Sequence, residues 1–162
     1  MHSVEAFLAT YGPIFVLVGA AVEGNTVTIT SGFLAHQGLI SPWAVFLAAF
    51  IGTALFDQAL FTIGRRAASL ALVRRQIGRP SFARVLALVG RNPVPILMVA
   101  RFVPGLRNLA PLAFAMSPIP GLQFLVLNLL AAAIWAAADT ALGYLFGGAI
   151  EAAGGALPAL EH

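Results

Sequence analysis

Two long runs of apolar residues dominate the chain, at 43–64 and 121–148. Each run is at least as long as the roughly 20 residues that a helix needs to cross the hydrocarbon core of a bilayer. A proline stands just before each run, Pro42 and Pro120, and proline is well tolerated at the start of a helix. The pattern predicts two transmembrane helices.

Two further apolar segments are interrupted. Segment 6–38 is apolar as far as Val22, turns polar at Glu23 and continues as a threonine-rich stretch that is too short to span a bilayer. Segment 93–120 contains repeated prolines, which break a continuous helix. We expect a first helix and a re-entrant, half-membrane piece in 6–38, and a second re-entrant segment in 93–120.

Most of the basic residues lie between these halves, in segment 65–91. They alternate there with Leu, Val, Ile and Phe at roughly helical spacing, which is typical of an amphipathic helix at a membrane surface. The positive-inside rule places this segment in the cytoplasm, next to anionic lipid head groups. Residues 149–162 form a tail rich in Gly and Ala. The arginines of the segment are Arg65, Arg66, Arg74, Arg75, Arg79, Arg84 and Arg91.

The two halves resemble each other weakly. Each has an interrupted segment followed by a span that starts after a proline, with a phenylalanine early in the span (Phe46 and Phe124). Because the arginine-rich segment separates the halves, they could insert in opposite senses. Inverted repeats whose broken helices meet near the midplane are a transporter architecture.

The composition supports the same fold class. Of the 162 residues, 60% are hydrophobic and only 9% are charged, whereas soluble domains are about 25% charged. We therefore predict one all-α polytopic integral membrane domain, a small helical bundle with two re-entrant segments in an inverted repeat. The chain has no cysteine, so it offers neither a disulfide nor a thiolate metal site. We expect no metal, cofactor or nucleic-acid partner.

Four charges lie inside the apolar segments, at Glu23, Asp57, Arg101 and Arg107, and Asp139 is a fifth candidate. A charge at bilayer depth is costly, so an intramembrane ionisable residue is by default a candidate functional residue. The two arginines bracket Pro104-Gly105, a pair that should break a helix. Broken backbone at membrane depth is tolerated only where it is buried in protein or lines a wet cavity. The pattern indicates a polar cavity that meets an anion.

The residue types suggest how such a cavity could work. Arg101 and Arg107 stay protonated and suit phosphate or carboxylate, so they could hold an anionic head group. Glu23 and Asp57 could take up and release protons. The alternative is that the arginines neutralise the two acids in buried ion pairs that fix the packing.

The remaining polar candidates have simpler interpretations. Asp139 lies near a helix end and can reach water, and His36 is expected at the membrane interface. The other histidines, His2 and His162, lie at the chain termini. No nucleophile, base and orienting group can be assembled from these residues, which argues against an enzyme.

The motif Arg101-Phe-Val-Pro-Gly-Leu-Arg107 resembles the signature of the DedA family, also called SNARE-associated or VTT-domain proteins. Supporting motifs are Gly32-Phe-Leu-Ala-x-x-Gly38, Gly52-x-x-x-x-Asp57 with Ile63-Gly64-Arg65, and the stretch from Asn128 through Trp135 to Gly143-Tyr144. The resemblance covers roughly Glu23 to Gly147. It implies a helical bundle with two facing re-entrant segments, an acidic pair at Glu23 and Asp57, and an arginine pair at Arg101 and Arg107.

The resemblance also implies a function. Family members are similar to lipid transporters or scramblases, and bacterial ones are associated with the return of undecaprenyl phosphate or phospholipid across the cytoplasmic membrane, with dependence on the proton-motive force. Many members carry a longer, proline-containing loop with a second acid after the first glutamate. Here Glu23-Gly24-Asn25 leads directly into Thr26.

The resulting hypothesis is a multi-pass flippase-like transporter of anionic lipids in the bacterial cytoplasmic membrane. Lipid phosphate would bind Arg101 and Arg107, and Glu23 and Asp57 would gate or exchange protons. One alternative is a proton-coupled exporter of small cations or drugs, in which the acids matter most. Another is a non-transporting scaffold that recruits partners through segment 65–91.

Overall fold

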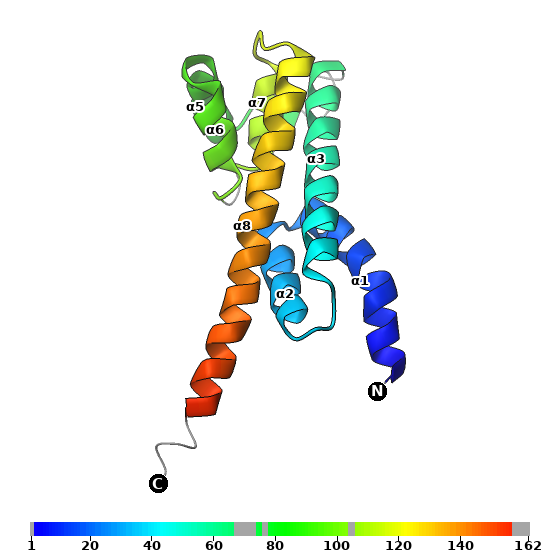
Figure 1. The fold of residues 1–162 in the computed structure, drawn as a ribbon. Helices are drawn as coiled ribbons and strands as arrows, with labels where there is room; N and C mark the ends of the chain where they lie inside the picture. Colours follow the sequence, from blue (N-terminus) through cyan, green and yellow to red (C-terminus); the bar gives the residue numbers. More distant parts are fainter. Residues whose placement is uncertain (1, 67–73, 76–77, 104–105, 157–162) are drawn as a thin grey trace. The chain divides into compact units, whose positions relative to one another are not determined.

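The computed structural model describes residues 2–66, 74–75, 78–103 and 106–156, and within these ranges every regular element is a helix. Figure 1 shows their course along the chain. The helices are α1 (His2–Val22), α2 (Asn25–His36), α3 (Pro42–Arg66), α5 (Pro80–Arg91), α6 (Pro93–Ala100), α7 (Leu109–Ala115) and α8 (Gly121–Ala156).

Two helices are long and apolar enough to cross a membrane. These are α3 and the Gly121–Ala152 part of α8, at the places where the sequence predicts transmembrane helices. The predicted first span ends at residue 64, close to the observed end of α3 at Arg66, whereas α8 continues past 148 to Ala156. The extension follows from its composition, because alanine favours a helix and no proline intervenes before Ala156.

The interrupted segments are pairs of shorter helices. Segment 6–38 contains most of α1, which begins at His2, and all of α2, and segment 93–120 contains α6 and α7. The predicted helix break at Pro104-Gly105 lies outside the described residues, but α6 ends at Ala100 and α7 begins only at Leu109. Their re-entrant course in a membrane stays a prediction.

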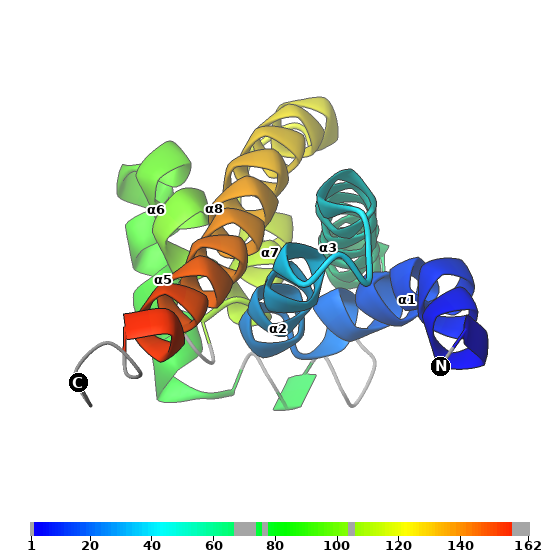
Figure 2. The same ribbon diagram turned by 60° about the horizontal axis from the view of Figure 1, so that its bottom comes forward.

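The chain packs as two compact units, one formed by Met1–Thr53 with Ala136–His162 and the other by Ala54–Trp135. In the first unit, α1 and α2 contact each other, and Figure 2 shows both helices. The turn between them contains Gly24, whose φ of 76° is the left-handed conformation that favours glycine. In the same unit α2 lies against α8, backbone to backbone. A Cβ on Gly32 would come within 2.5 Å of the carbonyl oxygen of Thr140, so this close approach requires glycine.

The second unit has a larger apolar core. The rings of Phe61 from α3 and Phe124 from α8 stack with their centroids 4.1 Å apart, and α7 is buried along its whole length. Helix α5 contacts both α6 and α7, and its apolar face lies inside this core. The part of segment 65–91 that the structure describes as α5 is amphipathic, as predicted, but its apolar face packs against protein. The buried residues of that face are Phe82, Val85 and Val89.

Arg65, at the end of α3, donates hydrogen bonds to the end of α7 and to the connection between α7 and α8. Its Nε donates to the carbonyl oxygen of Ala115 at 3.3 Å, and its Nη2 donates to those of Ser117 and Ile119 at 2.9 and 2.8 Å. Its guanidinium also lies over the ring of Phe61, 4.6 Å from the centroid. Ala115 is the last residue of α7, so its carbonyl group has no intrahelical partner, and the other two carbonyl groups belong to the connection that follows.

Candidate functional site: a buried cluster of charged residues

Asp57 and Arg101 form an ion pair inside the second unit. Asp57 lies in α3, and Arg101 is the residue at which α6 ends. The Nη2 of Arg101 is 2.7 Å from the Oδ2 of Asp57, and the two side chains are only 3% and 2% exposed. At this burial each charge depends on the other, because an unpaired ion in a low-dielectric interior is strongly destabilising.

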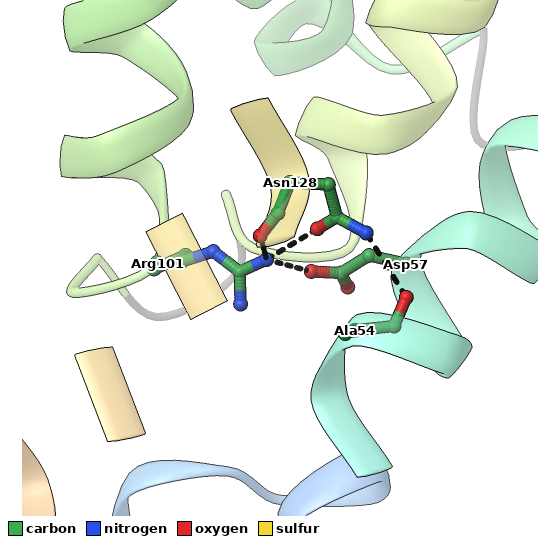
Figure 3. Close-up of polar contacts among 4 residues, drawn as sticks. All are labelled: Ala54, Asp57, Arg101 and Asn128. Atoms are coloured by element: carbon green, nitrogen blue, oxygen red, sulfur yellow. Dashed lines mark hydrogen bonds and ion pairs between the residues drawn. The ribbon is translucent and has the colours of Figure 1, made fainter. Parts of the chain in front are cut away.

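Asn128 completes the arrangement from α8. Its side-chain Oδ1 accepts a hydrogen bond from Nη2 of Arg101, and its backbone oxygen lies 3.4 Å from the same nitrogen. Its Nδ2 donates to the backbone oxygen of Ala54 at 3.0 Å. Figure 3 shows Arg101 directed at both Asp57 and Asn128. Asn128 therefore joins α3, α8 and Arg101, and orients the guanidinium toward the carboxylate.

Arg107, in the segment before α7, is the second buried cation of this unit, with 9% of its surface exposed. Its guanidinium carbon lies 5.1 Å from the centroid of the Trp135 ring, in cation–π contact. Trp135 itself is fully buried. The charge of Arg107 also acts on both Asp57 and Arg101, so the three charged groups belong to one cluster.

The cluster carries more positive than negative charge. Within the described part of the second unit, the buried ionic side chains are two arginines and one aspartate. The contacts given above for Arg101 involve its Nη2. Guanidinium groups of this kind are suited to bind a phosphate or carboxylate.

The other candidates lie in the first unit. Glu23 is exposed, in the turn between α1 and α2. Asp139 is buried in α8 with 1% exposure, which differs from the expectation that it reaches water. His36, at the end of α2, has its Nε2 3.1 Å from the Oε2 of Glu151 and packs edge-on against Tyr144. The structure thus gathers three of the four predicted charges, Asp57, Arg101 and Arg107, within one unit.

Two site residues were not assigned a role by the sequence reasoning. Asn128 and Trp135 were part of a family motif, with no function predicted for either. An asparagine in the middle of an apolar run is nevertheless a signal, because a buried amide needs hydrogen-bond partners. Trp135 gives no such signal, since an aromatic residue in an apolar helix is ordinary. No group of three or more His, Asp or Glu residues in the described parts of the chain could hold a metal ion.

Two long apolar helices and a buried cluster of charges together define a helical membrane protein with a polar interior site. The chain belongs to the VTT-domain (DedA) family, whose model matches residues 22–145. This match includes all four residues of the predicted acidic and arginine pairs.

The curated relatives are membrane proteins. The chain is 34% identical to the inner membrane protein YohD of Escherichia coli over 88% of its own length and 74% of the relative. It is 29% identical to an uncharacterised membrane protein of Synechocystis, with coverages of 85% and 67%. Identity to the inner membrane protein YabI of E. coli is 27%, with coverages of 83% and 54%. No solved structure matches the chain significantly.

Proposed function

We propose that this protein is a transporter that moves anionic lipids, such as undecaprenyl phosphate or phospholipid, across the bacterial cytoplasmic membrane. Two of its relatives are named inner membrane proteins, which supports that location. In this proposal the chain is a multi-pass protein, α1–α2 and α6–α7 form two re-entrant pairs in an inverted repeat, and segment 65–91 faces the cytoplasm.

One observation carries the proposal: two buried guanidinium groups, those of Arg101 and Arg107, belong to one cluster with the carboxylate of Asp57. Guanidinium groups suit phosphate, because their planar donors match the phosphate oxygens. A lipid phosphate could therefore exchange with the carboxylate of Asp57 as the anion at Arg101.

The geometry suggests how the phosphate could be bound and released. Phosphate oxygens would bind the guanidinium groups of Arg101 and Arg107, and the carboxylate of Asp57 would give up its contact with Arg101. A proton taken up by Asp57 would weaken that contact and favour the exchange. Asn128 keeps the guanidinium of Arg101 in place throughout, because its contacts do not depend on the carboxylate.

Glu23 has a different part in this proposal. It is exposed in the turn between α1 and α2, so it could exchange protons with water. We propose that it belongs to the proton-coupling path and that it does not bind the phosphate. Because Glu23-Gly24-Asn25 is followed directly by Thr26, Glu23 does not have beside it the second acid that many family members carry.

The test must separate transport from packing. Asp57→Asn together with Arg101→Gln replaces the ion pair by two neutral amides, which should retain the fold because removing both charges also removes their desolvation cost. The assay follows fluorescent phosphatidylglycerol and undecaprenyl phosphate across the membrane of vesicles that contain the purified protein. We expect the double variant and Arg107→Gln to lose roughly 10- to 100-fold in rate, the order expected for losing a charge-assisted hydrogen bond.

Arg91→Gln is the matched control. It makes the same change at an exposed position at the end of α5, and it should transport normally. Wild-type rates in the folded double variant would refute the proposal and support a packing role for the ion pair. If the wild type transported small cations and moved no lipid, the alternative function, a proton-coupled exporter of small cations or drugs, would be favoured.

A further inference from the structure

A groove at the arginine end of α3 is separate from the ion-pair cluster. It lies within the second unit and has a volume of about 400 Å³. Its described lining combines cationic, polar and apolar side chains. Arg65 and Arg66 lie at the end of α3, and Phe61, Leu122 and Leu125 form an apolar wall.

The cationic end of the groove is partly pre-organised. Arg65 is fixed by its contacts with three backbone carbonyls and with Phe61. Arg66 is exposed beside it, and no acidic residue is among the described residues that line the groove. Helix α8 starts in the same groove at Gly121, so the partial positive charge of its first turn adds to that of the two arginines. Positive groups of this kind favour an anion between them.

The position along the helices indicates which anion. The groove lies where α3 ends and α8 begins, at the ends of the two helices that are able to cross a membrane. Lipid phosphates lie at this level of a bilayer, just outside the hydrocarbon core. Leu122 is 73% exposed and lines the same groove as the two arginines. An amphiphile would satisfy both the cationic and the apolar parts of this lining.

We propose that this groove is a binding site for one anionic glycerophospholipid. The phosphate lies against Arg66 and the open edge of Arg65, and an acyl chain follows Leu122 and Leu125. The site is distinct from the cluster of Asp57, Arg101 and Arg107, and it does not rest on the transport proposal. The lipid bound here holds the ends of α3 and α8 together and is not the cargo.

The cysteine-free chain allows a direct test. Leu122→Cys, labelled with a fluorophore, reports on the groove in the full-length protein reconstituted in vesicles of phosphatidylcholine that contain increasing amounts of a brominated lipid. Leu142→Cys, labelled in the same way, is an exposed control site on α8 that does not line the groove. Brominated phosphatidylglycerol should quench the label at 122 at a mole fraction about fivefold lower than brominated phosphatidylcholine does, the order expected for one basic contact at a membrane surface. At 142 the two lipids should quench alike.

A pair of matched substitutions locates the effect. Arg66→Ala should abolish the preference for phosphatidylglycerol at 122, whereas Arg84→Ala removes the same charge from the exposed face of α5 and should leave the preference intact. Arg101→Gln should also leave it intact, because the ion-pair cluster is a separate site. Equal quenching by both lipids at 122 would overturn the proposal. An equal loss in Arg66→Ala and Arg84→Ala would also overturn it, because diffuse surface charge would then be the cause.

Discussion

The ion pair between Asp57 and Arg101 makes a quantitative prediction about stability. Because both side chains are almost fully buried and lie 2.7 Å apart, removing one charge leaves the other uncompensated. We expect each of the single variants Asp57→Asn and Arg101→Gln to lower the free energy of unfolding by about 3–5 kcal/mol. A Coulomb energy of about 4 kcal/mol, for unit charges 4 Å apart at an effective dielectric constant of 20, gives the same order.

The two single variants should not be equal. Asp57→Asn removes the carboxylate that pairs with Arg101 and also interacts with Arg107. After Arg101→Gln, the carboxylate still interacts with the positive charge of Arg107. Asp57→Asn should therefore be the more destabilising of the two.

The double variant completes the cycle. With both charges gone, the cost should fall to about 0–1 kcal/mol, so the coupling between the sites should exceed about 2 kcal/mol. Equilibrium unfolding of the purified protein in mixed detergent micelles measures all four free energies. A coupling near zero would refute the buried pair, and a larger loss for Arg101→Gln than for Asp57→Asn would refute the electrostatic account of the cluster.

Three further predictions use the same unfolding measurement. Gly143→Ala should destabilise the protein by about 2–4 kcal/mol, because its new Cβ would overlap the backbone of α2. Gly90→Ala, which has open space around it in α5, should instead stabilise the protein by about 0.5–1 kcal/mol. Similar effects of the two variants would contradict the close contact between α2 and α8. Trp135→Leu should cost about 1 kcal/mol more than Trp135→Phe, because only an aromatic ring keeps the cation–π contact with Arg107, and equal losses would argue against that contact. Arg65→Met should cost about 2–3 kcal/mol by leaving backbone carbonyls without a donor, and a neutral outcome would show that water replaces the guanidinium.

Local pattern was enough to locate most helices. The apolar runs at 43–64 and 121–148 predict α3 and α8. A helix satisfies its backbone hydrogen bonds internally, so it can be predicted from the local sequence without knowledge of its packing partners. The prolines of segment 93–120 predict its interruption for the same local reason. The pattern does not predict how far α8 continues beyond 148, because a Gly/Ala-rich sequence contains no strong stop signal.

Packing partners were harder to foresee. The spacing of Phe82, Val85 and Val89 indicates an apolar helix face, but a lipid surface and a protein core accept the same face. The structure places this face in the core of the second unit. Similarly, Asn128 stands out as a polar residue in an apolar run, while its contacts with Arg101 and Ala54 depend on elements far apart in the sequence.

The helical class, the two apolar spans and the residues whose charges are costly in a membrane follow from the sequence, because these properties depend only on local composition and spacing. Which of these charges meet follows from the packing of the helices. This packing paired Asp57 with Arg101, added Asn128 and set Arg107 over Trp135, while Glu23 belongs to the other unit. The physical reason is that Coulomb and hydrogen-bond energies depend on distances of a few ångströms between side chains from different helices, and those distances are set by how the helices pack.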